Sequence, residues 1–526
     1  MTAINNSRAL VCVPVCVRRA SELPDAIERA AQLADVIELR FDCLADDAQL
    51  DDALRDLRPI LKARTRPFIS TFRPAEQGGA RALDKQQRLL FWIQNDFYSN
   101  NKIADYADIE LDLLPLVGKR ENEWLLKATD WERVICSHHD FVGVPADLEA
   151  IYERMTKTPA RILKIAVQAD EITDCIPVLR LLERARSEGR EMIAIAMGEA
   201  GLLTRVLAPA FGSFLTYGSL DDEHATAPGQ VTVRELRDLY CVHSITERTL
   251  ITGLVGSPVA HSVSPHMHNA AFAARGIDAV YIPFETRDAR AFVRRMAHTQ
   301  TRELVWNLRG FSVTAPHKGA IMDGLDFVEP AAREIGAVNT VVCEGNELHG
   351  YNTDADAALA PLDDVIDLKG ARVAVIGAGG AARSVLWSLR ERGARATVFA
   401  RDIERARAIG EKFDAKSLPL AGAQFSGFDA VINATPLGTR GAHVTETAAT
   451  SVQLRGARVA YDLVYNPSQT RFLSEARAAG CETTLSGLAM LVAQAAAQFK
   501  LWTGADAPVE VMKSAAEERL MQRDSN

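Results

Sequence analysis

Residues 371–401 read ARVAVIGAGGAARSVLWSLRERGARATVFAR: an apolar strand, a glycine-rich turn, a helix and a second strand. The pattern Gly377-x-Gly379-x-x-Ala382 stands at the turn between the first strand and the helix. Glycine at such a turn lets the backbone approach a pyrophosphate at the helix N-terminus, whereas the same letters outside this context are weak evidence. The stretch therefore predicts a dinucleotide-binding α/β domain rather than a simple tight turn.

The end of the second strand bears on which nucleotide binds. It carries Arg401 and no acidic residue that would pair with the hydroxyls of a ribose, and Arg405 lies one helical turn further on. Two arginines here suit the 2′-phosphate of NADP, because guanidinium groups form charge-assisted hydrogen bonds with phosphate. NAD, with a solvated and charged helix start, is the alternative, since Asp402 and Glu404 are close by.

The segment before this domain carries polar residues at the ends of strand-like runs. ITGLVGSPVAHSVSPHMHNAAF (251–272) is typical of a strand, a polar turn and a helix, with Pro265 suited to the first helical turn. Three further β-like runs lead into polar motifs: GFSVTAPHK (310–318), AVNT (337–340) and YNTD (351–354). By spacing alone, Ser262 and Ser264 fit turn and helix-cap positions better than a ligand site.

The first half of the chain alternates between short β-rich runs and stretches of helical period. The runs are VCVPVCV (11–17), DVIELRFD (35–42), PFISTFR (67–73), YADIELD (106–112), RVICSHHD (133–140), RILKIAV (161–167), EMIAIAMG (191–198) and GSFLTYGS (212–219). Such repeats are the content of a (β/α)8 barrel or of an open doubly wound sheet, and their number favours the barrel.

Charged side chains cluster at the ends of these runs: Glu38, Arg40 and Asp42, then Arg73, then Glu110 and Asp112, then His139. Each alone is explained by the start of a solvated loop. Active sites of barrels, however, are built at the C-terminal ends of the strands, so together these side chains would converge on one mouth.

Lys164 stands inside RILKIAV, on the same face as Ile162 and Ala166. A lysine that faces a barrel interior loses hydration, which favours the neutral amine, and a neutral amine can attack a ketone to form an imine. The alternative is an edge-strand lysine whose ammonium group reaches water.

Composition narrows the classes of partner. The formal net charge of −9 offers no basic surface for nucleic acid. No apolar run reaches the ~18–20 residues of a membrane span, and the N-terminus lacks the pattern of a signal peptide. We expect a cytoplasmic protein that acts on small molecules, with its oligomeric state left open.

Cys12 and Cys16 lie in one apolar run, where buried, reduced thiols are favoured over a metal pair, and no metal site is predicted.

Residues 9–241 resemble the type I 3-dehydroquinate dehydratases. The motifs appear in family order: ELRFD (38–42), TFRPAEQGG (71–79), HHDF (138–141), LKIAV (163–167), AMGEAGLLTR (196–205) and ATAPGQ (225–230). The resemblance implies that Lys164 forms a Schiff base with the substrate and that His139 is the general acid and base. It implies that the substrate is held by Glu38, Arg40, Arg73, Arg205, Thr226 and Gln230, with Arg205 as the carboxylate clamp.

Two positions depart from that family. Gln77 stands where a glutamate is common before the paired glycines, with Glu76 one position earlier, and Thr226 stands where a serine is usual. An amide cannot transfer a proton, so acid–base help from position 77 is lost, although hydrogen bonding is kept.

Residues 249–520 resemble the shikimate dehydrogenases. The motifs are HSVSP (261–265), SVTAPHK (312–318), AVNT (337–340), NTDAD (352–356), GAGGAAR (377–383), NATPLG (433–438), YDLVYNP (461–467) and GLAMLVAQA (487–495). The resemblance makes Lys318 and Asp354 the catalytic pair. Implied substrate-binding residues are Ser262, Ser264, Thr314, Asn339, Tyr465 and Gln494. Implied cofactor-binding residues are Gly377, Ala378, Gly379, Gly380, Ala381, Ala382, Arg401, Arg405, Asn433, Thr435 and Gly487.

These observations predict an α/β chain of two modules. We expect a (β/α)8 TIM barrel over residues 1–242, followed by a two-lobed α/β dehydrogenase. Its substrate lobe would span residues 249–354, completed by 487–520, around an NADP-binding Rossmann domain at 355–486.

The two resemblances imply consecutive reactions on one compound: 3-dehydroquinate loses water to give 3-dehydroshikimate, which NADPH then reduces to shikimate. One alternative is a dehydrogenase that uses quinate and NAD. Another is a ligand-sensing regulator built from former enzyme domains, which the presence of all four catalytic groups disfavours.

Overall fold

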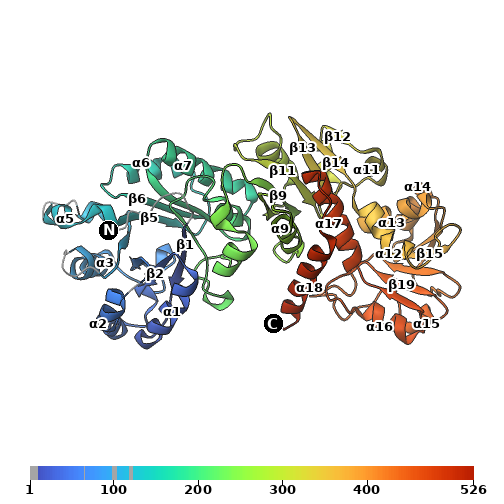
Figure 1. Cartoon of the computed structure of the whole chain (residues 1–526), viewed down its shortest axis with the longest axis horizontal. Helices are drawn as coiled ribbons and strands as arrows, with labels where there is room; N and C mark the ends of the chain where they lie inside the picture. Colours follow the sequence, from blue (N-terminus) through green and yellow to red (C-terminus); the bar gives the residue numbers. More distant parts are fainter. Residues whose placement is uncertain (1–9, 64, 98–102, 118–122, 526) are drawn as a thin grey trace.

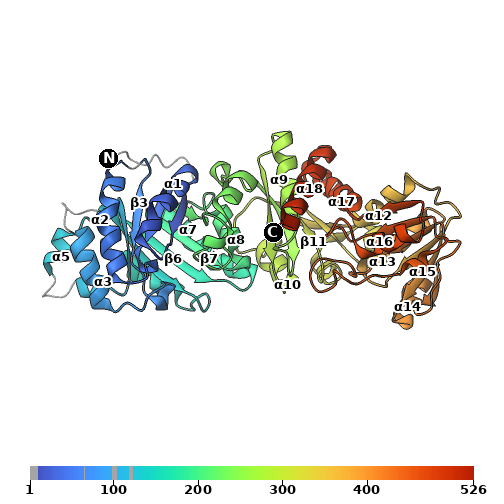
Figure 2. The same cartoon turned by 90° about the horizontal axis from the view of Figure 1, so that it is seen from below.

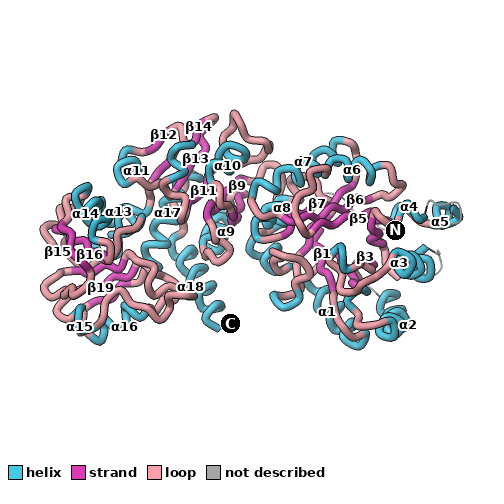
Figure 3. Tube along the Cα trace, turned by 180° about the vertical axis from the view of Figure 1, so that it is seen from behind, coloured by secondary structure: helices cyan, strands magenta, loops and turns pink. Residues whose placement is uncertain are grey.

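The computed structural model describes residues 10–63, 65–97, 103–117 and 123–525. The chain forms two lobes, with the first half of the sequence in one and the second half in the other (Figure 1). Within the described ranges, the strands form one sheet of eight strands and two sheets of six. Figure 3 shows helices on the outside of the strands in both lobes.

The eight-stranded sheet is a nearly closed parallel barrel. Its strands are β1 (Leu10–Val15), β2 (Val36–Arg40), β3 (Phe68–Thr71), β4 (Tyr106–Glu110), β5 (Val134–Asp140), β6 (Ile162–Gln168), β7 (Glu191–Met197) and β8 (Leu215–Tyr217). Consecutive strands pair from β1 to β7, and β8 pairs with β1. No ladder joins β7 to β8, but the backbone N–H of Phe214 donates to the carbonyl of Met192 across the gap at 2.7 Å. The predicted barrel is confirmed.

The helices of this lobe surround the barrel (Figure 2). They are α1 (Leu23–Leu33), α2 (Asp47–Ala63), α3 (Lys85–Trp92), α4 (Leu114–Val117), α5 (Glu123–Ala128), α6 (Leu148–Thr156), α7 (Cys175–Ser187) and α8 (Leu202–Leu207). The barrel interior is filled by alternate strand residues, among them Ile69, Ile135, Ile162 and Ala166. Lys164 shares the face of the last two, as the alternation of strand side chains predicts.

The prediction that Cys16 is a reduced core thiol is wrong. Cys16 lies just beyond β1 and forms a disulfide with Cys43, which lies just beyond β2. Because the strand ends at Val15, the alternation that grouped Cys16 with Cys12 does not extend to it. Cys12 is free and buried in the barrel interior. In the part of the chain that the structure describes, no group of His, Cys, Asp or Glu could hold a metal ion.

The first sheet of the second lobe is mixed, with the order β10-β9-β11-β13-β14-β12. Its strands are β9 (Leu250–Gly256), β10 (Ala279–Glu285), β11 (Leu308–Val313), β12 (Phe327–Val328), β13 (Thr340–Glu344) and β14 (Glu347–Tyr351). Its helices are α9 (Ser264–Arg275), α10 (Ala289–Phe292), α11 (Pro330–Ile335) and α12 (Asp354–Asp363). Strands β9, β10 and β11 are parallel, so their C-terminal ends share one edge.

The second sheet of this lobe is fully parallel, with the order β17-β16-β15-β18-β19-β20. The strands are β15 (Arg372–Ile376), β16 (Arg395–Ala400), β17 (Lys416–Pro419), β18 (Ala430–Asn433), β19 (Val459–Asp462) and β20 (Thr483–Leu485), with helices α13 (Gly380–Glu391), α14 (Ile403–Lys412), α15 (Ser451–Leu454) and α16 (Arg471–Ala478). This is the strand order of the Rossmann fold, whose ligands bind at the switch point between the first and fourth strands, here β15 and β18.

The chain then returns to the mixed sheet through α17 (Leu488–Thr503) and α18 (Val509–Ser525), which lie beside α9 (Figure 1). Phe499 of α17 stacks on Phe272 of α9 at 5.3 Å between ring centroids, and the indole N–H of Trp502 donates to the Val341 carbonyl at 3.0 Å. The mixed sheet is therefore covered by α9, from the beginning of the second lobe, and by α17 and α18, from its end.

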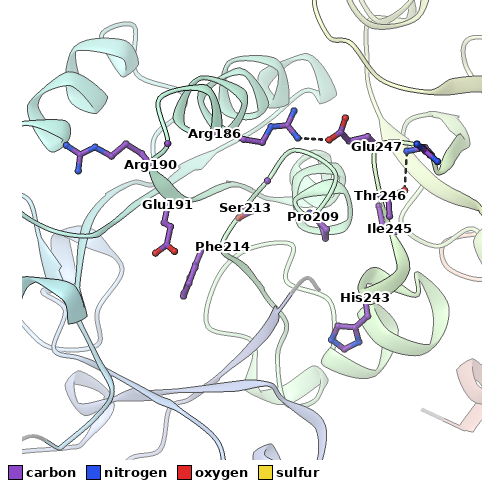
Figure 4. A pocket seen from close by; sticks show the side chains of 13 residues that line it. Arg186, Arg190, Glu191, Pro209, Ser213, Phe214, His243, Ile245, Thr246 and Glu247 are labelled. Atoms are coloured by element: carbon purple, nitrogen blue, oxygen red, sulfur yellow. Dashed lines mark hydrogen bonds and ion pairs between the residues drawn. The ribbon is translucent and has the colours of Figure 1, made fainter. Parts of the chain in front are cut away.

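Direct contacts hold the two lobes together. The carboxylate of Glu171 accepts hydrogen bonds from the Thr286 hydroxyl at 2.8 Å and from the Arg287 amide at 2.9 Å. Figure 4 shows the groove where the connecting segment leaves the barrel, with Arg186 of α7 directed to Glu247 at 3.0 Å. Throughout the described ranges, no helix is long and apolar enough to cross a membrane.

Candidate active sites

A cavity opens where the barrel strands end, and the residues predicted for the first site line it together. They are Glu38, Arg40, Arg73, His139, Lys164, Arg205, Thr226 and Gln230. Three other charged residues from strand ends do not line this cavity. Asp42 pairs with Arg40, with an N–O distance of 2.7 Å. Glu110 and Asp112 instead bind Arg88 of α3, with N–O distances of 3.0 and 2.8 Å.

Lys164 is buried among three oxygen atoms from three other strands. Its Nζ lies 2.7 Å from Asp108 Oδ2, 3.0 Å from the Tyr217 hydroxyl and 3.4 Å from Glu38 Oε1. Its exposed fraction is 3%, so the expected loss of hydration is present. Both carboxylates accept hydrogen bonds from Nζ, and the amine must carry a lone pair before it can attack a ketone, so a proton has to leave an ammonium Nζ first.

Asp108 and Tyr217 were not predicted from the sequence. Asp108 also accepts from Arg73 at 2.8 Å. Burial acts to raise the pKa of Asp108, but the charges of Lys164 and Arg73 outweigh it and hold that pKa below its ordinary value. Alternation in YADIELD could have identified Asp108, because it shares a strand face with Glu110.

His139 is buried at the end of β5, and neither ring nitrogen has a hydrogen-bond partner within the described structure. Burial, together with the positive charge of Arg73 and Lys164, lowers the pKa of His139 well below its ordinary value. The imidazole is therefore neutral at physiological pH and can accept a proton, which is the requirement for a general base.

Arg205 on α8 is 1% exposed and has no acidic partner in the described part of the chain. Its guanidinium donates to the carbonyls of Tyr217 at 3.3 Å and Pro228 at 3.5 Å, and its Nε has no partner. Burial lowers the pKa of Arg205 to about 10. A buried, uncompensated guanidinium that lines a cavity is suited to a carboxylate ligand.

The segment between β8 and the connecting chain closes one side of this cavity. Gln230 Oε1 accepts from the Thr226 amide at 2.8 Å and from its hydroxyl at 3.2 Å. Between them, Gly229 has φ +62°, and a Cβ there would lie 2.1 Å from the Gly198 carbonyl oxygen. Glycine is thus required for the close packing that places Thr226 and Gln230.

A second cavity lies at the C-terminal edge of β9 and β11, and all residues predicted for substrate and catalysis in the second site line it. They are Ser262, Ser264, Thr314, Lys318, Asn339, Asp354, Tyr465 and Gln494, joined by Gly487. Lys318 Nζ lies 2.5 Å from Asp354 Oδ2. Gln498, which sequence reasoning missed, also lines the cavity one helical turn beyond Gln494. Two amides spaced by four residues on one helix face were the available signal.

Polar contacts fix the orientation of Asn339 in this cavity. Its side-chain N–H donates to the Thr353 hydroxyl at 2.9 Å, and its Oδ1 accepts from the Thr353 amide at 2.8 Å. Thr353 directly precedes Asp354, the first residue of α12. Asn339 therefore ties the loop before β13 to the start of the helix that carries the acidic partner of Lys318.

The glycine turn after β15 leaves room for a pyrophosphate. Gly377 has φ +118°, and a Cβ there would lie 2.9 Å from the Ala434 carbonyl oxygen. Gly379 precedes α13, and a Cβ on it would meet nothing within 4 Å. Of the neighbouring predicted residues, Ala382 is buried in the core, while Ala378, Gly380 and Ala381 are partly exposed at the start of the helix.

Arg401 and Arg405 are exposed beyond the end of β16, and no ion pair to either occurs within the described residues. Asp402 caps α14, because its Oδ1 accepts from the Arg405 amide at 3.1 Å. Arg407 on the same helix is instead paired with Glu404 at 2.7 Å. Two unpaired guanidinium groups at this strand end fit a phosphate.

Asn433 and Thr435 shape the turn after β18. Asn433 is buried, its Oδ1 accepts from the Thr435 hydroxyl at 2.7 Å, and its N–H donates to Asp462 at 2.9 Å. With its side chain committed to these bonds, Asn433 can serve a nucleotide only by holding the turn in place.

A third cavity lies between the lobes, and Gln230 of the first site and Ser262 of the second both line it. One predicted residue of each site therefore lines a cavity that both modules share.

Known protein families match both halves of the chain. The profile described as type I 3-dehydroquinase matches residues 11–247. Three further profiles match the second half: the shikimate dehydrogenase substrate binding domain at 254–341, shikimate / quinate 5-dehydrogenase at 359–460 and the shikimate 5′-dehydrogenase C-terminal domain at 487–517.

Relatives are similar over one module or over both. The chain is 32% identical to the chloroplastic bifunctional 3-dehydroquinate dehydratase/shikimate dehydrogenase of Arabidopsis thaliana, over 96% of this chain and 83% of that protein. It is 42% identical to the NADP(+) shikimate dehydrogenase of Methanosarcina acetivorans, over 51% of this chain and 98% of that protein. A crystal structure of the Thermus thermophilus enzyme with NADP(H) and shikimate is 37% identical and covers 51% of this chain and 99% of its own, with a TM-score of 0.46.

The fold and the two sites define a two-module enzyme, with a lyase barrel followed by a dinucleotide-dependent oxidoreductase. The chain belongs to the family of bifunctional 3-dehydroquinate dehydratase/shikimate dehydrogenases, in which a type I dehydroquinase module precedes an NADP-dependent shikimate dehydrogenase module.

Proposed function

We propose that the barrel dehydrates 3-dehydroquinate through an imine at Lys164. The observation that carries this assignment is the placement of Lys164 and Arg205 in one cavity, because a nucleophilic nitrogen and a carboxylate clamp are what a keto acid needs. Arg205 binds the carboxylate, and Glu38, Arg40, Arg73, Thr226 and Gln230 hold the remaining substrate oxygens.

His139 serves as the general acid and base of this module. Once the imine is protonated, it withdraws electrons from the neighbouring carbon, and neutral His139 removes a proton from that carbon. The imidazolium that results then gives its proton to the hydroxyl that leaves as water. Hydrolysis of the imine returns Lys164 and releases 3-dehydroshikimate.

The second module reduces the ketone of 3-dehydroshikimate to give shikimate. NADPH supplies the hydride when it is bound at the Gly377–Ala382 turn. Lys318 donates a hydrogen bond or a proton to the substrate oxygen as negative charge develops there, and Asp354 orients the ammonium group at 2.5 Å. Ser262, Ser264, Thr314, Asn339, Tyr465 and Gln494 bind the carboxylate and hydroxyls.

Arg401 and Arg405 bind the 2′-phosphate, which selects NADP over NAD. The substrate lobe comprises residues 249–354 and 487–520, and the Rossmann domain spans 355–486 after a barrel at 1–242. The protein acts in the cytoplasm on small molecules and contacts neither nucleic acid nor membrane.

The proposed function is tested by one experiment for each module. Full-length protein is incubated with 3-dehydroquinate and sodium borohydride, and the adduct is located by peptide mass mapping. We expect one adduct, on Lys164. Dehydration that proceeds with no trapped adduct would rule out the imine. Parallel incubations of shikimate or quinate with NADP or NAD, in which the alcohol is oxidised and the nicotinamide is reduced, test the choice of substrate and nucleotide.

A further inference from the structure

The three contacts of Lys164 Nζ differ in what they can do. A carboxylate only accepts hydrogen bonds, so Asp108 and Glu38 serve the ammonium form alone. The Tyr217 hydroxyl, 3.0 Å away, is the one contact of the three that can also donate. When Nζ gives up a proton, its new lone pair has a donor available only in the direction of Tyr217.

Tyr217 comes from β8, which lies two strands from the strand of Lys164 in the closed barrel, with β7 between them. It ends β8, is 5% exposed and lines the cavity, and Lys164 Nζ lies 4.5 Å from its ring centroid. The Tyr217 carbonyl accepts from Arg205 at 3.3 Å. One residue therefore contacts the nucleophile through its side chain and the carboxylate clamp through its backbone.

We propose that Tyr217 is a catalytic residue of the dehydratase module, whose hydroxyl donates to the lone pair of neutral Lys164 and then to the substrate oxygen that Lys164 displaces. This inference rests on the proposed imine at Lys164. It assigns imine formation a dedicated donor besides His139.

The proton balance closes without an external acid. The Lys164 ammonium and the ketone together give a protonated imine and water. Nζ forms the C–N bond, the C–O bond breaks, and two of the three ammonium protons leave with the oxygen. His139, which lines the same cavity and has no hydrogen-bond partner among the described residues, holds each of the two protons in turn between its removal and its transfer, so that Asp108 and Glu38 stay ionised. Tyr217 donates a hydrogen bond throughout and keeps its own proton, because burial and the nearby Glu38 carboxylate raise the pKa of Tyr217 well above its ordinary value.

The test variant is Tyr217→Phe, which keeps the ring and its packing and removes only the hydroxyl. Tyr106→Phe is the matched control, because Tyr106 also lies in the barrel-interior cluster but makes no contact with Lys164. The rate of borohydride-trapped adduct at Lys164 is measured from pH 5.5 to 9.5 in full-length protein. Reduction of added 3-dehydroshikimate in the same samples checks that the chain is folded.

We expect Tyr217→Phe to slow trapping about tenfold at neutral pH, the loss of one hydrogen bond to a reacting nitrogen. The pH of half-maximal trapping should rise, because the variant lacks the hydroxyl that can donate to the lone pair of the neutral amine. The charged and titratable groups that face this point are Cys12, Glu38, Arg40, Arg73, Asp108 and His139. Tyr106→Phe should stay within twofold of the parent protein.

A wild-type rate and pH profile in Tyr217→Phe, or a fall in the half-maximal pH, overturns the role of Tyr217. Absence of any adduct in the parent protein overturns the imine itself, so the two failures are distinct. If Tyr217→Phe does not fold, 3-fluorotyrosine is placed at position 217. This phenol is more acidic and donates more strongly, so it should move the half-maximal pH down, and an unchanged profile overturns the role.

Discussion

Replacing both Arg401 and Arg405 by alanine should weaken NADPH selectively. Arg401 follows the end of β16 and Arg405 lies in the first turn of α14, and neither has an ion pair in the described chain, so their removal breaks no ion pair. The Asp402 cap of α14 uses the backbone amide of Arg405 and survives the substitution. The loss should therefore fall on the 2′-phosphate, which NADH lacks.

The expected loss of affinity for NADPH can be estimated from the exposure of the two arginines. A hydrogen bond to a charged group contributes roughly 1.5–3 kcal/mol, and exposed pairs fall at or below the low end because water screens them. Both arginines are exposed. We therefore expect ~1–1.5 kcal/mol from each contact, or five- to tenfold per arginine and roughly 25- to 100-fold for both.

The assay is the reduction of 3-dehydroshikimate at varied NADPH and NADH, followed by the loss of nicotinamide absorbance. KM for NADPH should rise by the factor above, while KM for NADH and kcat stay within twofold. Arg407→Ala is the control, because Arg407 is on the same helix but pairs with Glu404. An equal loss with both nucleotides, or an equal loss of NADPH in the control, would refute phosphate binding by Arg401 and Arg405.

Three other perturbations test the separation of the sites and the burial of charge. Lys164→Ala should abolish dehydration but leave reduction of supplied 3-dehydroshikimate within a few-fold of normal; loss of both steps in a variant shown to be folded by thermal melting would mean that the modules share a site. Lys318→Ala should let 3-dehydroshikimate accumulate from 3-dehydroquinate, as product chromatography would show, and continued formation of shikimate would contradict its role. Burial raises the pKa of Glu110 from 4.5 to about 7, so the stability contributed by its protonated form is lost as pH rises through 7. The melting temperature of Glu110→Gln relative to the parent should therefore increase between pH 5 and pH 8.5. Asp112→Asn, at a carboxyl whose pKa is lowered, should show a constant difference over that range, and the same trend in both would contradict the assignment.

Lys164 could be predicted from the sequence because the pattern that identifies it lies within one strand. Alternation of side chains along β6 predicts which face of the strand carries Lys164, and in the structure Lys164 lies on that face. Its partners Asp108 and Tyr217 come from β4 and β8, neither of which pairs with β6. The contact with Asp108 spans the intervening strand β5, and the contact with Tyr217 depends on closure of the sheet, because β8 lies at the opposite end of the strand order. No pattern within one segment contains that information.

The prediction that Cys16 is a reduced thiol was wrong for a related reason. Cys16 and Cys43 are 27 residues apart, and they meet because β1 and β2 run parallel with Val15 opposite Leu39. Both cysteines then lie just past the C-terminal ends of neighbouring strands, with Cα atoms 5.4 Å apart. Sequence spacing gave neither the strand ends nor the register, and the pairing needs both.

The contacts of Gln77 give a physical reason for its departure from the family pattern. Its side-chain N–H faces Asp112 Oδ1 at 3.4 Å, and it does not line the cavity with His139 and Lys164. Asp112 is held ionised by Arg88, at 2.8 Å, and by Lys85, at 3.3 Å. A carboxylate at position 77 in this conformation would place a second negative charge against Asp112, whereas an amide can donate to it. The glutamine therefore belongs to the polar cluster around Arg88, and the proton transfers of the dehydratase fall to the groups that do reach the cavity.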